Sequence, residues 1–204
     1  MTDIMLPEPL VTRQAEHTCW AAAAVSWVDA NRRLNGITAT RPITTQGLVN
    51  MFRDAGFLEA RDRLSDEFWG PFTQVLGMRL TLERPGHVTA HRLSRWLAED
   101  GYVYLVGRRR GHRVSHVVVV YGVQGNVVYF MEPLFGALRH LPLGQALAGM
   151  SVVGVGRPLL GRAPRNPFLQ MSAPASSSAA PRLPSNPLMP GGGGIYMGSP
   201  GRQR

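Results

Sequence analysis

Hydrophobic positions recur at helical spacing in the first half of the chain and at strand spacing in the second half. From Thr18, the run TCWAAAAVSWVDANRRLNG predicts a helix, because alanine is the best helix former, Thr18 can cap its start and Gly36 marks its end. One face of this helix would carry Trp20, Ala24, Trp27 and Val28. Cys19 therefore falls in the first helical turn.

Three further helices and one strand are predicted before residue 102. Residues 44–56 and 65–77 have helical spacing, with Thr45 and Ser65 as caps, although Gly70 and Pro71 weaken the second helix. The run MRLTLER, residues 78–84, alternates as a strand. Residues 89–101 return to helical spacing and end at Gly101.

After Gly101 the pattern becomes that of extended chain. Residues 102–108, 115–123 and 127–133 are β-branched and aromatic runs, joined by RRGHRV and QGN, which are typical of hairpin turns. A short helix near residues 142–150 and a last strand over 151–156 complete the pattern. A helical half followed by an antiparallel sheet predicts the α+β class.

The chain divides into a folded domain, residues 1–156, and a tail, residues 157–204. The tail is rich in Pro, Gly, Ser and Ala and has no periodicity, so we expect it to be disordered. Residues 1–156 have 16 Arg and 13 acidic residues, whereas the tail has 6 Arg and no acid. Because most of the net charge of +9 comes from the tail, we expect no specific nucleic-acid partner.

Composition restricts the compartment and the chemistry. One cysteine excludes an intramolecular disulfide and a multi-cysteine zinc site, and no His or Cys spacing suggests a metal, so no cofactor is expected. The longest apolar run is too short to span a membrane, and the N-terminus lacks the features of a secretory signal. We expect synthesis in the cytoplasm, with export only by a specialised secretion system, and a monomer. The absence of Lys is first explained by drift in nucleotide composition. It also removes side-chain ubiquitin acceptors, which would suit an effector inside a foreign cell.

Cys19 has the sequence context of a nucleophile. A helix N-terminus stabilises a thiolate, and small alanines after Cys19 allow close packing of the helix against another element. Gln14, five residues upstream, can donate an amide hydrogen bond to an oxyanion. The alternative for a single cysteine is a small buried hydrophobic residue.

His116 and Glu132 are the candidate partners of Cys19. His116 begins an otherwise apolar strand, where burial of an imidazole without a role is costly. Glu132 ends the neighbouring predicted strand, where its carboxylate can accept from the imidazole. His17 is a competing base, but we expect it to point away from Cys19. The basic run at Arg108, Arg109, Arg110 and Arg113 around His112 is either a solvated turn or a selector of acidic substrate segments.

Three motifs together resemble the papain-like cysteine peptidase superfamily. They are Q-x4-C-W-A-A, H-V-V-V-V-Y-G and E-P-x-x-G, in this order, and the similarity covers residues 10 to about 156. The sequence is most similar to short bacterial members, which include effector proteases and relatives of bacteriocin-leader peptidases. The resemblance implies Cys19 as nucleophile, His116 as general base, Gln14 as oxyanion donor and Glu132 as the residue that orients His116. The family usually has Asn or Asp in the position of Glu132.

The implied function is a cysteine-dependent hydrolase, a peptidase or a related amidase or deamidase, that acts on a protein or peptide through an acyl-enzyme. Two alternatives stay open. A peptidoglycan amidase or endopeptidase of the NlpC type uses the same Cys and His, although the D-C-S-G-F-like context of that group is absent. A catalytically inactive papain-like module would keep the scaffold for binding only. The sequence does not identify the substrate.

Overall fold

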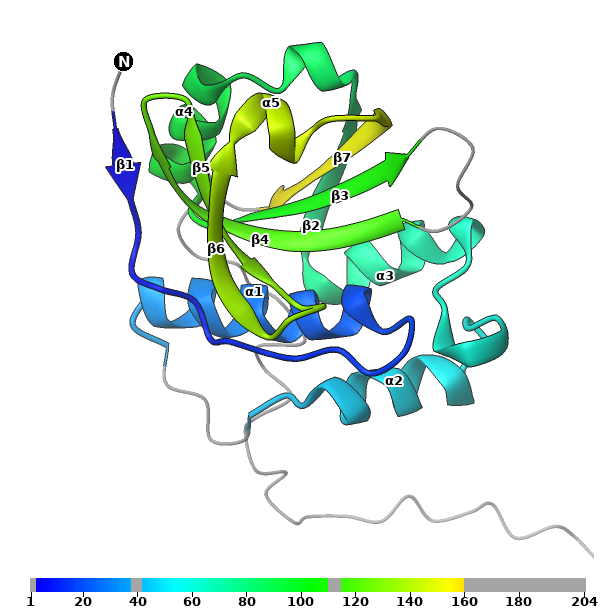
Figure 1. Ribbon diagram of the computed structural model, residues 1–204. Coiled ribbons are helices and arrows are strands. Elements are labelled where there is room, and N and C mark those ends of the chain that lie inside the picture. Colours follow the sequence, from blue (N-terminus) through cyan, green and yellow to red (C-terminus); the bar gives the residue numbers. More distant parts are fainter. Residues whose placement is uncertain (1–2, 38–41, 110–114, 160–204) are drawn as a thin grey trace, which may run out of the picture. The chain divides into compact units, whose positions relative to one another are not determined.

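The computed structural model describes residues 3–37, 42–109 and 115–159. Five α-helices and seven strands lie in these residues (Figure 1). The helices are α1 (Cys19–Leu34), α2 (Thr45–Asp54), α3 (Trp69–Leu76), α4 (Ala90–Asp100) and α5 (Leu143–Ala146). The strands are β1 (Ile4–Met5), β2 (Met78–Glu83), β3 (Val103–Arg109), β4 (Ser115–Gln124), β5 (Val127–Glu132), β6 (Ala137–Pro142) and β7 (Met150–Pro158). No helix in the described part is long and apolar enough to cross a membrane.

The strands form one antiparallel sheet in the order β2-β7-β3-β4-β5-β6, and β1 pairs with β4. The predicted α+β class is confirmed. The hairpin between β4 and β5 has the predicted QGN turn, with Gln124 opposite Val127. Strands β3 and β4 also pair as predicted, while their connecting turn lies outside the described residues.

Helices cover both faces of the sheet. Residues 102–106 show the alternation: Tyr102, Tyr104 and Val106 pack in the core that contains α1, α2 and α3, whereas Val103 and Leu105 pack with α4 and α5. Helix α4 thus packs on the face of the sheet opposite to α1. Figure 1 shows α1 and α2 together on one side of the sheet and α4 and α5 away from them.

Helix α1 is buried along nearly its whole length, and not only on the predicted face. Residues 6–18 run along it as an N-terminal strap, which covers the side that faces away from the sheet (Figure 1). The Thr12 hydroxyl donates to the carbonyl of Ala22 at 2.8 Å, so the strap is attached to the helix itself. With a neighbour on each side, α1 needs small side chains, which its four consecutive alanines provide.

Several local predictions change at the ends of elements. The Thr18 hydroxyl donates to Ala15 O instead of capping α1, and the cap of α2 is Thr44, not Thr45. The predicted helix over 65–77 is a short 3-10 turn followed by α3. Strand β7 continues past Gly156 to Pro158, and the predicted tail beyond residue 159 lies outside the described residues. Strands β1 and β6 were not predicted.

Candidate active site

Cys19 is the first residue of α1 and lies against the start of β4. Its side chain is buried, with 6% of its surface exposed, and Sγ lies 3.7 Å from the backbone oxygen of Ser115. Backbone N–H groups in the first turn of a helix have no intrahelical acceptor. The thiol thus lies at the end of the helix whose dipole favours negative charge.

Trp20 fixes the first turn of α1. Its indole Nε1 donates to the carbonyl of Asp62 at 2.9 Å, and its ring packs edge-on against Phe52 and Phe72 at 5.4 and 5.6 Å. From the sheet, the Tyr104 hydroxyl donates to the carbonyl of Trp20 at 2.7 Å. The residue next to Cys19 is therefore anchored on two sides, by a loop and by β3.

His116 and Glu132 form a short hydrogen bond at the ends of β4 and β5. His116 Nε2 lies 2.6 Å from Glu132 Oε1, and the carboxylate is buried with 8% of the residue exposed. The same oxygen accepts from the backbone N–H of Leu134 at 3.1 Å. Because Nε2 faces Glu132, Nδ1 is the nitrogen left to exchange a proton with another group.

The pKa of His116 reflects contact with both partners. Burial lowers this pKa, but hydrogen bonds to the side chains of Cys19 and Glu132, together with their negative charges, outweigh burial and raise it from 6.5 to about 9. Both Cys19 and Glu132 thus act on the pKa of the imidazole. The structure brings together these three candidates, which are separated by 97 and 16 residues in the sequence.

Gln14 lies in the N-terminal strap, five residues before Cys19. Its backbone N–H donates to Pro133 O at 2.9 Å, which ties it to the turn after Glu132. Its side-chain Oε1 is buried and has no hydrogen-bond partner in the described part of the chain. No hydrogen bond joins the Gln14 amide to Cys19 among the described residues. A buried carbonyl oxygen without a hydrogen-bond partner is costly.

The other candidates lie elsewhere. His17 has a positive φ of 60° and its Nε2 lies 3.3 Å from Glu16 Oε1. Of the basic run, residues 110–114 lie outside the described residues, and Arg108 lines the cavity described next. Within residues 3–37, 42–109 and 115–159, no three His, Cys, Asp or Glu side chains are arranged to hold a metal ion.

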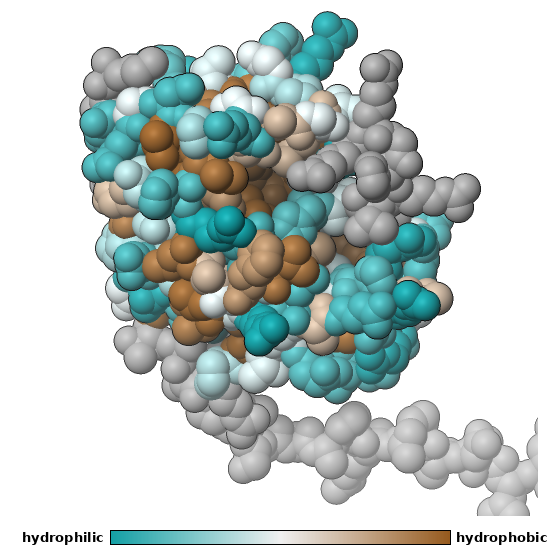
Figure 2. Space-filling view, in the orientation of Figure 1, coloured by the Kyte–Doolittle hydropathy of each residue, from teal (hydrophilic) through white to brown (hydrophobic). Residues whose placement is uncertain are grey.

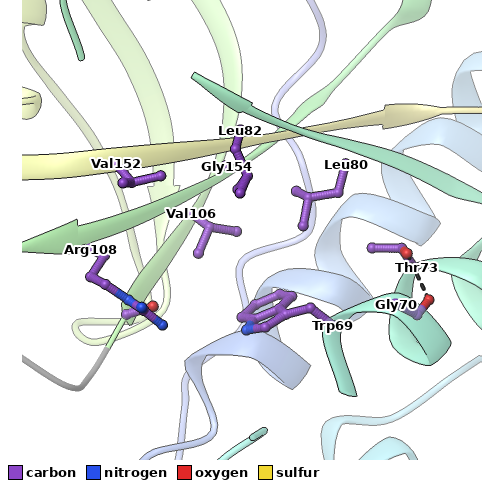
Figure 3. A pocket seen from close by; sticks show the side chains of 10 residues that line it. Trp69, Gly70, Thr73, Leu80, Leu82, Val106, Arg108, Val152 and Gly154 are labelled. Atoms are coloured by element: carbon purple, nitrogen blue, oxygen red, sulfur yellow. Dashed lines mark hydrogen bonds between the residues drawn. The ribbon is translucent and has the colours of Figure 1, made fainter. Parts of the chain in front are cut away.

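A cavity of about 490 Å³ opens beside Ser115, the residue that contacts Cys19. It lies on the α1 side of the sheet, where β2, β7 and β3 extend beyond α3. Its lining includes Trp69, Leu80, Leu82, Val106, Val152 and Gly154. Figure 3 shows Trp69 pointing from α3 toward Val106 and Leu80, with Arg108 at the end away from Thr73. The space-filling view shows apolar patches at the surface between hydrophilic side chains, and a hollow in this face (Figure 2).

Sequence reasoning did not find this cavity or the role of Tyr104. The lining residues come from five separate segments, and most are apolar, so most have the pattern of a core position. The Tyr104 hydroxyl bonds a backbone carbonyl of α1, and a backbone partner cannot be recognised from the sequence.

Several solved structures are similar to this chain, and one of them is a peptidase domain. No known protein family matches the sequence, and neither does any curated protein. That peptidase domain belongs to Streptococcus ComA, a bifunctional ABC transporter involved in a quorum-sensing pathway. The similarity covers 74% of this chain and 98% of that domain, with 14% identity and a TM-score of 0.49.

Proposed function

We propose that this chain is a papain-like, cysteine-dependent hydrolase that cleaves amide bonds in proteins or peptides. The observation that carries the proposal is a buried thiol at the N-terminus of α1 that lies against Ser115, next to a His116 imidazole bonded to a buried carboxylate. In this proposal Cys19 is the nucleophile, His116 the general base, Glu132 the residue that orients His116, and Gln14 an oxyanion donor.

In the proposed reaction, His116 takes the proton of Cys19 and stays paired with the thiolate. Sulfur attacks the substrate carbonyl carbon, a C–S bond forms, and the carbonyl electron pair moves to oxygen. The backbone N–H of Cys19 and the Gln14 amide would donate to that oxyanion. As the C–N bond breaks, the imidazolium protonates the leaving amine. Water, deprotonated by His116, then hydrolyses the thioester and releases the acid and the thiol.

The Glu132 carboxylate would hold His116 in the productive orientation and stabilise its charged form. The raised pKa of His116, about 9, supports this role because the charged form then persists over the physiological range. The bond from Leu134 N–H keeps the carboxylate oxygen in place. The longer side chain of Glu, compared with the Asn or Asp of the family, is accommodated at the end of β5.

The cavity beside Ser115 suggests a preference in the substrate. Its apolar lining favours a bulky apolar side chain close to the cleaved bond. The absence of lysine supports a further part of the proposal, that the protein acts as an effector in an environment with ubiquitin ligases.

The test combines labelling and substrate screening. A thiol-directed epoxide should modify Cys19, the only cysteine, and mass spectrometry of the digested protein locates the label. The labelled protein and Cys19→Ala should both lose hydrolysis of peptide or protein substrates by at least about 1,000-fold. Cleavage of cell-wall fragments alone would assign the enzyme to peptidoglycan instead. Full activity of Cys19→Ala on a cleaved substrate would refute the proposal.

A further inference from the structure

The turn between β5 and β6, residues 133–136, is hydrogen-bonded to two candidate site residues, Glu132 and Gln14. On one side the Leu134 N–H donates at 3.1 Å to Glu132 Oε1, the oxygen that also bonds His116. On the other side the carbonyl of Pro133 accepts from the backbone N–H of Gln14 at 2.9 Å. One short turn is therefore hydrogen-bonded to the candidate orienting residue and to the candidate oxyanion donor.

Gly136, the last residue of this turn, leaves the space in which the strap lies. Its φ is +59°, a conformation that side chains disfavour. A Cβ atom at this position would lie 2.9 Å from Cβ and 3.5 Å from Cα of Arg13. The Cβ atom of Arg13, the residue before Gln14, thus lies too close to admit a side chain at residue 136.

Gly125 is a control glycine, because it has the positive φ of Gly136 but not its close neighbour. It is in the turn at the other end of β5, with a φ of +56°, and nothing lies within 4 Å of the Cβ that it lacks. Both glycines meet the same backbone requirement, but only Gly136 is also required by a neighbouring segment. The close contact with Arg13 is not needed for the turn itself.

We propose that Gly136 is a positioning residue that sets the Gln14 amide in the oxyanion hole by letting the strap close on the turn. This inference rests on the proposed function, in which Gln14 is an oxyanion donor. A side chain at 136 would push Arg13 and Gln14 away from the turn. The contact between His116 and Glu132 would be kept, because it lies on the other side of the turn.

Two reagents distinguish an effect on the oxyanion donor from an effect on the reactivity of Cys19. Acetylation of Cys19 by p-nitrophenyl acetate passes through an oxyanion, whereas alkylation by iodoacetamide displaces iodide and forms none. We expect Gly136→Ala to slow acetylation by about 10- to 100-fold, less than the loss of a complete oxyanion donor. Its alkylation rate should stay within about twofold of the wild type across pH, because the Cys19 and His116 pair is unchanged. Gly125→Ala, with the same backbone strain, should leave both rates unchanged.

Two double variants sharpen the test. Arg13→Gly removes the atoms that a new Cβ would meet, so Arg13→Gly with Gly136→Ala should recover most of the acetylation rate. In a Gln14→Ala background, Gly136→Ala should add little, because the donor is already absent. If Gly136→Ala does not fold, the Arg13→Gly double variant must fold; if neither folds, Gly136 is only structural and the inference is wrong.

The outcomes separate this inference from the proposed function. If the wild type is acetylated at Cys19 but Gly136→Ala reacts equally fast, or loses both reactions to the same extent, Gly136 does not position Gln14. If wild-type Cys19 is not acetylated and alkylates no faster than a free thiol, the proposed function fails, whatever Gly136 does.

Discussion

The two faces of the sheet are covered by helices of opposite character. On one face α1 presents alanines that are completely buried, among them Ala21, Ala23 and Ala24. On the other face α4 fills the space with large side chains, Leu93, Trp96 and Leu97. Helix α1 also buries Trp20 and Trp27, but its run of alanines has no counterpart in α4.

The difference explains why the candidate site lies where it does. Small side chains let the backbone of α1 lie close enough for the Tyr104 hydroxyl to reach the carbonyl of Trp20 and for Sγ of Cys19 to approach the Ser115 carbonyl. A helix built like α4 would keep the cysteine away from β4. Helix α1 therefore carries the candidate nucleophile, whereas α4 contributes large side chains to the core.

The largest expected effect is on the α4 face. Trp96 is buried, and the guanidinium groups of Arg92 and Arg157 lie 4.7 and 5.2 Å from its ring centre. Trp96→Ala should lower the free energy of unfolding by about 3–5 kcal/mol, measured by urea denaturation. The rate of Cys19 acetylation per folded molecule should stay within about twofold of the wild type. A fall in this rate as large as that of a site variant would show that the α4 face also positions the site.

A smaller effect is expected at the end of β5. Glu132→Gln removes the charge that helps to raise the pKa of His116 and keeps the shape, so it should slow acetylation of Cys19 by about 10- to 100-fold. The alkaline limb of the rate profile should move to lower pH, because the variant imidazolium loses its proton earlier. If the acetylation rate and the alkaline limb of its pH profile do not change, Glu132 has no role in the reaction.

The same substitution has a consequence for stability. The folded-state pKa of His116, about 9, lies above its ordinary value of 6.5, so protonation stabilises the folded wild type. This contribution is complete below about pH 6.5 and is lost as the pH rises through about 9. Urea denaturation should therefore show the stability advantage of the wild type over Glu132→Gln shrinking between these pH values.

The smallest effect is expected from the tail. We propose that the domain ends after Leu159, because Pro158 pairs with Met78 and the Leu159 N–H donates to Gly77 O at 2.9 Å. Removal of residues 160–204 should change the free energy of unfolding by less than about 0.5 kcal/mol and leave the activity unchanged. Removal from residue 157 should destabilise the domain, since Arg157 bonds Asp100 at 3.0 Å. A large loss of stability on removal of residues 160–204 would show that the tail packs on the domain.

Much of the fold could be predicted because local patterns determine it. The periods of α1, α4 and the strands β3, β4 and β5 are long and regular. Strand β6 was missed because Arg139 and His140 interrupt its alternation with two successive exposed residues, and β1 is only two residues long. The face of the sheet on which α4 packs is a tertiary property, and a hydrophobic stripe does not specify it.

The candidate site was predictable in its residue types but not in its geometry. Cys19, His116 and Glu132 each stood out against their local sequence. The cavity at Trp69 and the contact of Gly136 with Arg13 join segments that are far apart in the chain, and only the tertiary structure brings them together. A glycine after a strand indicates a turn, and nothing in the sequence indicates which neighbour needs the space.

The most direct test of the account is the titration of His116. The central claim is that this imidazole is coupled to Cys19 and to Glu132 at once. Nuclear magnetic resonance of the six histidine rings, with His116 assigned by its loss in His116→Asn, gives its pKa. We predict a pKa of about 9 in the wild type and lower values in both Cys19→Ala and Glu132→Gln. A wild-type pKa near 6.5 that neither substitution changes would contradict the account.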